Sequence, residues 1–295
     1  MKGYLMIQRF VAYLDILGFK NLVQQKDGKE VLEIMEVFRE AVNFANSIPV
    51  PDTTLSLTTS LIHLAMFSDS VILYTDGIES HDFFRIVHVT KSLIASSLIC
   101  KAPLRGSIAH GEFYADEKNE IFFGKALLEA YKNEGKQQWA GAYICENTMN
   151  FVLSQFPDTL SILKKFAYLV EYPIPFKCVG QKANAEQSSK NSPSKHNLVL
   201  NWANMAPELK PLLARNISTG YPFLSIIFDA IVDKANDDSS ISEEDKKNMV
   251  FRLDRTKIEQ DILDKWDNTR SFFNYAKDKG TSPLRFSQKP NSKNS

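Results

Sequence analysis

Two aspartates, Asp15 and Asp69, are the residues whose type and setting best suit chemistry. Asp15 follows a short apolar run that fits a buried strand, and Asp69 lies in the polar segment Phe-Ser-Asp-Ser at 67–70. Each has a structural interpretation, since aspartate caps helices and is common in turns. Side by side, however, two carboxylates repel each other unless a cation neutralises them. The pair therefore suggests a two-metal centre for phosphoryl transfer.

The elements that must position these aspartates alternate between strands and helices. Hydrophobic periodicity predicts strands at 7–14, 55–66, 71–74, 104–114 and 121–123, and helices at 29–45, 81–98 and 124–134. This order predicts an α+β fold of the ferredoxin-like βαββαβ type, with helices packed on a mostly antiparallel sheet. The first strand then lies beside the hairpin strands, so that Asp15 and Asp69 meet at one edge of the sheet.

Polar stretches divide the rest of the chain. We expect a first unit at 1–180, a mobile polar loop at 181–197 and a disordered tail at 281–295. A short strand is expected at 197–202, and with a helical extension it makes up the unit at 198–280. A further polar stretch at 233–248 is expected to be a loop, and the clearest helical pattern follows at 254–275.

Composition and charge exclude several classes of protein. The 295 residues include 35 Lys plus Arg and 35 Asp plus Glu, and this balance argues against a nucleic-acid partner. Cys100, Cys145 and Cys178 form no CxxC pair, so neither a zinc ribbon nor a disulfide framework is suggested, and a cytoplasmic location fits best. No apolar run is long enough for a membrane span, and no signal peptide is recognisable.

Two further motifs make a family resemblance specific. Residues 105–111 read Arg-Gly-Ser-Ile-Ala-His-Gly, and Gly124 opens a helical pattern. With Asp-Ile-Leu-Gly-Phe at 15–19 and the hairpin, they resemble in order the catalytic domain of class III nucleotidyl cyclases, over about residues 5–175. Within that superfamily the chain is most similar to the bacterial pyrimidine cyclases of the Pycsar anti-phage systems. The shared features are Phe-Ser-Asp-Ser, Ala130-Tyr131, the strand near 197 and Asn268-Thr269-x-x-Phe272.

The resemblance implies a metal and phosphate site. Asp15 and Asp69 match the metal-binding aspartates, and Ile16 matches the residue whose carbonyl also binds metal, with two Mn²⁺ or Mg²⁺ ions per site. The segment that lies along the triphosphate in the family corresponds here to Gly18, Phe19 and Lys20.

The resemblance also implies a pyrimidine substrate. Ala65 and Ile121 stand where purine cyclases carry base-reading polar residues, and neither can read a purine edge. His63 is in step with Ala65 along its strand, so it either approaches the base or packs structurally.

The transition-state residues of purine cyclases are replaced. Leu128 and Lys132 occupy the places of an asparagine and an arginine, and lysine lacks the bidentate fork of arginine. Lys132 and Arg105 are therefore the candidate transition-state donors.

The function implied is conversion of UTP or CTP, with UTP slightly favoured, to the 3′,5′-cyclic monophosphate and pyrophosphate. The family implies a homodimer with interfacial active sites and a separate effector that binds the cyclic nucleotide. Two other readings stay open: a catalytically dead nucleotide sensor, and a palm-type polymerase or nuclease.

Overall fold

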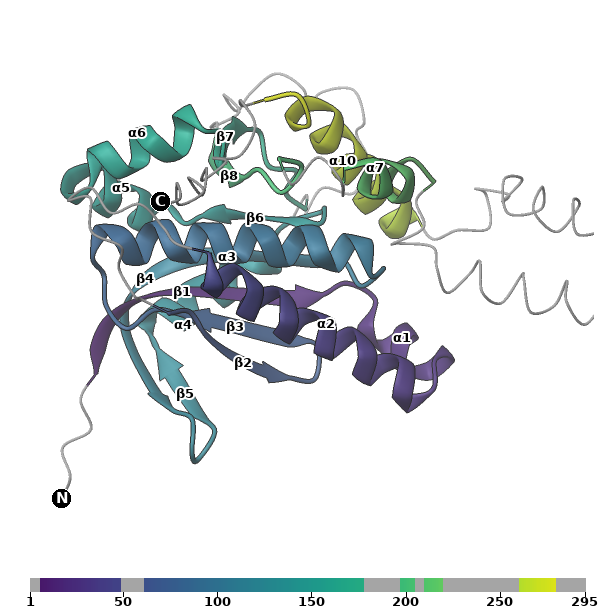
Figure 1. Cartoon of the computed structure of the whole chain (residues 1–295), viewed down its shortest axis with the longest axis horizontal. Helices are drawn as coiled ribbons and strands as arrows, with labels where there is room; N and C mark the ends of the chain where they lie inside the picture. The colour runs from purple at the N-terminus through teal and green to yellow at the C-terminus, as the bar shows by residue number, and fades with distance from the viewer. Residues whose placement is uncertain (1–5, 49–60, 178–196, 205–209, 220–259, 280–295) are drawn as a thin grey trace, which may run out of the picture.

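The backbone is organised around one mixed sheet of eight strands (Figure 1). The computed structural model describes residues 6–48, 61–177, 197–204, 210–219 and 260–279. Strand order is β2-β3-β1-β4-β6-β8-β7, with β5 paired to β4, and only the β4–β6 pair is parallel among the described strands. The strands are β1 (Ile7–Ile16), β2 (His63–Phe67), β3 (Ser70–Tyr74), β4 (Leu104–Asp116), β5 (Ile121–Gly124), β6 (Gly141–Ile144), β7 (Leu169–Tyr172) and β8 (Asn197–Leu200).

Helices cover both faces of this sheet. Helices α2 and α3 pack on one face, and α4 packs on β1 and β4 from the other. The predicted α+β fold with a mostly antiparallel sheet is confirmed. No helix within the described ranges has the length and apolar character needed to cross a membrane. The helices are α1 (Phe19–Gln25), α2 (Gly28–Ser47), α3 (Ser80–Ile99), α4 (Lys125–Glu134), α5 (Glu146–Gln155), α6 (Pro157–Lys165), α7 (Lys210–Thr219) and α10 (Gln260–Ala276).

Local signals explain where the helices begin. The Asp27 side chain accepts a hydrogen bond from the Glu30 amide at 2.8 Å and so caps α2. Helix α3 starts with a reciprocal capping box between Glu79 and Asp82. Gly124 joins β5 to α4 with a φ of 155°, and a Cβ there would meet the Glu112 carbonyl oxygen at 2.2 Å. Only glycine fits that junction.

Alternation along β1 separates the core from the site. Phe10, Leu14 and other even-numbered residues enter the large core beneath α2 and α3. Val11 and Tyr13 instead join the smaller clusters beneath α4. Since successive side chains of a strand point to opposite faces, Asp15 lies on the α4 face with Val11 and Tyr13.

Several expectations fall partly or wholly outside the described residues. The first hairpin strand was expected from 55, but residues 49–60 are not described, and β2 begins at His63. The expected loops at 181–197 and 233–248, apart from residue 197, and the tail at 281–295 also lie outside them. Helix α10 matches the described part of the pattern at 254–275. Strand β8, which was expected in the C-terminal extension, lies between β6 and β7 in the same sheet.

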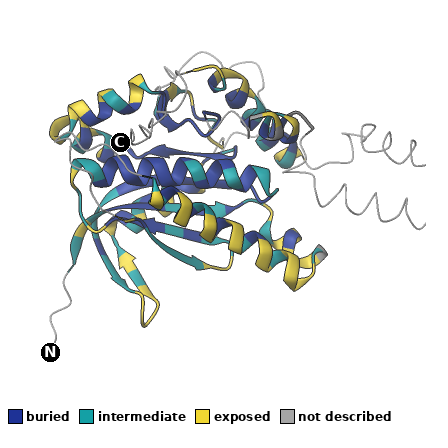
Figure 2. Ribbon diagram, viewed as in Figure 1, coloured by how far each residue is buried: buried dark blue, intermediate teal, exposed yellow. Residues whose placement is uncertain are grey.

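Helix α3 is buried along most of its length, including charged and titratable residues (Figure 2). His88 is 9% exposed, stands beside Lys91 and Arg85, and packs against the Tyr168 ring. Burial, and then the charges of Lys91 and Arg85, lower the pKa of His88 to about 3. His88 is therefore neutral in the fold at physiological pH.

This histidine should make the fold sensitive to mild acid. A histidine in an unfolded chain has a pKa near 6.5. Below that pH, His88 binds a proton in the unfolded state but stays neutral in the native state. The free energy of unfolding should thus fall by about 2 kcal/mol between pH 7 and pH 5 because of His88 alone. Urea titrations of wild type and His88→Phe at several pH values measure this, and an identical pH dependence in both would contradict it.

Candidate active site

The end of β1 and the β2–β3 turn bring the two aspartates together. Asp15 pairs with Ser70 across β1 and β3, and the Ile16 amide donates to the Asp69 carbonyl oxygen at 2.9 Å. The turn is only two residues long, with Ser68 at a φ of 56°, so Asp69 stands directly beside the end of β1. The expected meeting of Asp15 and Asp69 is therefore present, while their roles remain predictions.

Asp15 is a partly buried carboxyl among charges of both signs. Burial raises the pKa of Asp15 to about 7; the charges of Glu134 and Asp69 add to the increase, and the charges of Arg105 and Lys265 oppose it. Carboxylate and carbonyl oxygens are the ligands that Mg²⁺ and Mn²⁺ prefer, so the donor set fits a divalent cation. No group of three or more His, Cys, Asp or Glu side chains suited to a metal occurs among the described residues. Beyond the two aspartates and the Ile16 carbonyl, a substrate or water would complete the ligand set.

Arg105, at the start of β4, is held rigidly next to this pair. Its guanidinium is ion-paired with Glu134 from the last turn of α4, and its Nη1 donates to the Gln137 carbonyl oxygen at 2.9 Å. Its Nη2 lies 3.7 Å from Asp15 Oδ2. Arg105 is only 6% exposed, so these partners fix its guanidinium beside the aspartates.

The turn from β1 into α1 offers backbone amides at the same edge. Gly18 adopts a left-handed conformation with a φ of 78° and precedes α1, and its carbonyl accepts from the Asn21 and Leu22 amides. Phe19 packs against the core, whereas Gly18 and Lys20 are exposed. The first amides of a helix have no acceptor within the helix and can bind an anion.

Two of the proposed base-reading residues, His63 and Ala65, lie on β2, the first strand of the hairpin. His63 begins β2, where Nε2 lies 2.9 Å from Asp76 and Nδ1 lies 2.9 Å from Glu117, and its ring stacks on Tyr74. Ala65 pairs with Ile72 within the hairpin. His63 is thus bridged to acidic partners at the end of the hairpin opposite Asp69.

Ile121 is not close to the aspartates within one chain. It pairs with Asp116 at the far end of β4, whereas Arg105 stands near the start of that strand. At about 3.3 Å per residue, the strand between them spans up to about 36 Å. Leu128 and Lys132 lie exposed on α4. The structure therefore gathers Asp15, Asp69, Arg105 and the Gly18 turn, but not Ile121.

Sequence reasoning missed Glu134 and Gln137, the residues that hold Arg105. Both are buried and follow no local motif. Their partner lies 29 and 32 residues earlier in the chain, so only the tertiary fold reveals the contact.

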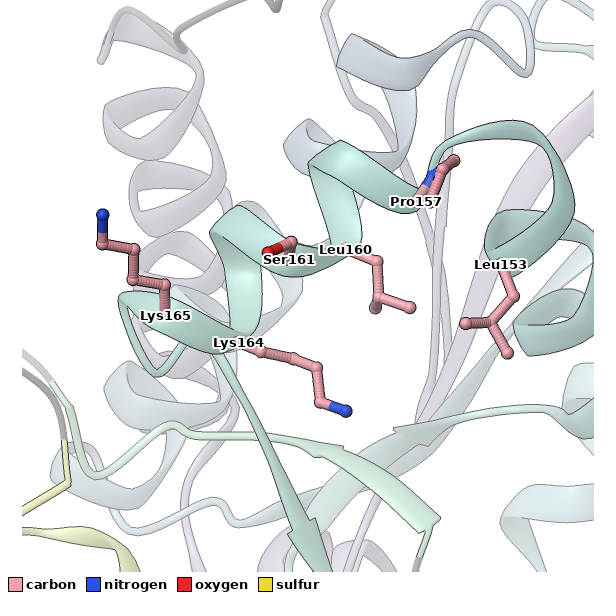
Figure 3. A pocket seen from close by; sticks show the side chains of 6 residues that line it. All are labelled: Leu153, Pro157, Leu160, Ser161, Lys164 and Lys165. Atoms are coloured by element: carbon pink, nitrogen blue, oxygen red, sulfur yellow. The ribbon is translucent and has the colours of Figure 1, made fainter.

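The described surface includes a hollow near the candidate site and another away from it. One, of about 480 Å³, adjoins the loop that holds Arg105 and is lined by Gln138, Pro175, Phe176, Lys177, Asp261, Asp264, Asp267 and Asn268. The other, of about 550 Å³, lies along α5 and α6 and is lined by Leu153, Pro157, Leu160, Ser161, Lys164 and Lys165 (Figure 3). Those two helices carry none of the candidate site residues, and Lys164 is already paired with Glu171.

Comparison with known proteins gives a limited likeness to nucleotidyl cyclases. No protein-family model and no curated protein matches the chain. The catalytic core of a rhodopsin-guanylyl cyclase with converted specificity, solved with ATPαS, has a TM-score of 0.39 and 12% identity, covering 66% of this chain and 94% of that one. The guanylate cyclase domain of RhGC from Catenaria anguillulae, solved with GTP, has a TM-score of 0.37 and 12% identity, covering 57% and 90%. A bacterial light-regulated adenylyl cyclase has a TM-score of 0.35 and 11% identity, covering 50% and 45%.

Proposed function

We propose that the chain is a nucleotidyl cyclase that converts UTP or CTP to the 3′,5′-cyclic monophosphate. The observation that carries this proposal is the convergence of Asp15 and Asp69 beside the buried Arg105 and the Gly18 turn. A carboxylate pair suits divalent cations, and a fixed guanidinium suits phosphate. Together they form a site for a metal-bound nucleoside triphosphate.

The chemistry needs positioning and charge more than a protein base. The ribose 3′-oxygen would attack the α-phosphorus, the bond to the bridging oxygen of pyrophosphate would break, and the 3′-hydroxyl proton would leave to solvent. Two Mg²⁺ or Mn²⁺ ions held by Asp15, Asp69 and the Ile16 carbonyl would lower the pKa of the 3′-hydroxyl and neutralise the leaving pyrophosphate. Arg105 would bind the phosphates, and the segment Gly18, Phe19 and Lys20 would lie along them.

Base choice is proposed to follow from apolar residues. Ala65 and Ile121 would leave the polar edge of adenine or guanine unpaired, at a cost of about 1–3 kcal/mol for each lost partner. His63 and backbone groups would be left to read a smaller pyrimidine.

The four NTPs distinguish pyrimidine from purine selection. The kcat/KM values for UTP or CTP should exceed those for ATP and GTP by roughly a hundredfold with the same metal. Steady-state kinetics with Mn²⁺ measures the ratio. Equal or faster turnover of a purine would contradict the proposed pocket.

The active site is further proposed to form between two copies of the chain. Ile121 and Asp15 are too far apart in one chain to contact one nucleotide, and a second copy would resolve this. Large apolar side chains are also exposed on the β2–β3 hairpin, β5 and α4, namely Phe67, Ile121, Phe123, Leu128 and Tyr131. Burying such side chains favours association.

A catalytically inactive nucleotide sensor is the second candidate. Leu128 offers no polar group where purine cyclases have an asparagine, and Lys132 is the only cation left on that pair of positions. Such a sensor would bind a pyrimidine triphosphate without forming a product.

The active cyclase would have a signalling role. Its product, the cyclic nucleotide, would signal phage infection to a separate effector that binds it.

A further inference from the structure

The loop at 135–140, between α4 and β6, sets the position of Arg105. The carbonyl of Gln137 accepts from Arg105 Nη1, and the Gln137 side-chain amide donates to the Gly106 carbonyl at 2.7 Å. Gln137 is fully buried, and its Oε1 accepts from Trp139 Nε1 at 2.8 Å. A shift of this loop would therefore move the guanidinium relative to Asp15.

Helix α10 holds the same loop from outside. The Ala140 amide donates to Thr269 Oγ1 at 2.8 Å, and Asn268 Nδ2 donates to the Gln138 carbonyl at 2.8 Å. The Thr269 hydroxyl is itself oriented, because it donates to the Lys265 carbonyl at 2.7 Å and the residue is fully buried. These contacts join segments about 130 residues apart in the chain.

Ring packing also seats helix α10, partly on the same loop. Phe272 packs edge-on against Trp139 of the loop and against Tyr172 of β7, with ring centroids 4.8 and 5.0 Å apart. Trp266 Nε1 donates to the Ile217 carbonyl of α7 at 2.9 Å. Figure 1 shows α10 and α7 together beside the sheet. A seated helix can transmit its position to the loop through Thr269 and Asn268.

One lysine of α10 also acts on the site electrostatically. Lys265 is close enough to Asp15 for its charge to act on that carboxylate, and it is paired with Asp261. Asp261 in turn accepts from the Gln138 side chain at 2.6 Å. Helix α10 therefore acts electrostatically on Asp15 and also contacts the loop that holds Arg105.

We propose that Thr269, assisted by Asn268, is a positioning residue for Arg105, so that the docked α10 sets the affinity of the site for a triphosphate. This inference rests on the proposed function, because Arg105 must be a phosphate ligand. It assigns a role to the C-terminal helix that neither the metal aspartates nor the base pocket requires.

The test compares Thr269→Val with Thr269→Ser in the full chain. Valine keeps the shape but removes the acceptor for the Ala140 amide, whereas serine keeps it. The probe is 3′-deoxy-UTP or 3′-deoxy-CTP with Mn²⁺, since neither can cyclise. We expect Thr269→Val to weaken binding about tenfold, Thr269→Ser to stay within about twofold, and the control Ser271→Ala, on the exposed side of α10, to match wild type.

A double-mutant cycle separates positioning from general destabilisation. In an Arg105→Lys background, Thr269→Val should cause little further loss, because the group it positions is already changed. Asn268→Ala provides a second probe if the valine variant does not fold, with an expected loss of about threefold. Wild-type binding by the folded valine variant, an undiminished effect in the Arg105→Lys background, or equal losses in the serine and valine variants would overturn the inference. Absence of any nucleotide binding by wild type would instead overturn the proposed function and this inference with it.

Discussion

Replacing Asp69 with alanine is expected to reduce kcat by more than about a thousandfold while leaving the fold intact. The side chain sits in the two-residue β2–β3 turn, beside the end of β1, and its backbone bond to Ile16 does not depend on the carboxylate. Removing it would leave Asp15 as the single carboxylate proposed to hold metal. Initial rates with the preferred NTP and Mn²⁺ measure the loss.

A matched control comes from a helix that carries none of the candidate site residues. Asp158 is exposed in the first turn of α6. Asp158→Asn should therefore keep near-normal turnover. If folded Asp69→Ala retained a tenth of wild-type activity, the metal assignment would be wrong.

Mixing two inactive chains is expected to restore activity. If each site combines Asp15 of one chain with Lys132 of the other, an Asp15→Ala chain and a Lys132→Ala chain form a mixed dimer with one intact site. Random equal mixing should then give about a quarter of wild-type turnover from two nearly inactive proteins. The assay is turnover across mixing ratios after the chains have exchanged.

The control for this rescue is the double variant Asp15→Ala/Lys132→Ala mixed with each single variant, which leaves no intact site. Should Lys132→Ala alone remain active, an Ile121→Arg chain, blocking the proposed base side, replaces it in the same scheme. Mixed dimers that form without any rescue would mean that each site is built from one chain.

Local sequence signals predicted the part of the fold that holds the aspartates. The helical periodicity of α2 and α3, and the glycine that precedes α4, can be recognised in short stretches of the sequence. The meeting of Asp15 and Asp69 followed from strand order together with the short hairpin turn, which leaves Asp69 little freedom. Register then fixed which face of β1 carries the carboxylate.

Other parts of the site depend on contacts between distant segments. Strands β6 and β7 have four residues each, too few for a periodic pattern, and β8 enters the sheet between them from a later segment. Glu134 and Gln137 bind Arg105, and Thr269 binds the loop at 135–140. Each of these contacts joins residues that share no local sequence motif. The raised pKa of Asp15 likewise arises from burial and from Glu134, so it could not be inferred from the residues around position 15.

The most direct measurement of the central claim is the identity of the products that the purified protein forms from UTP and CTP with Mn²⁺. Mass spectrometry, with chromatography against 2′,3′- and 3′,5′-cyclic standards, distinguishes a cyclic monophosphate from a linear monophosphate, a diphosphate or a polymer. The account predicts 3′,5′-cUMP or 3′,5′-cCMP with one pyrophosphate per turnover, and loss of both products in Asp69→Ala. Nucleotide binding without any product, or products that are only linear, would contradict it.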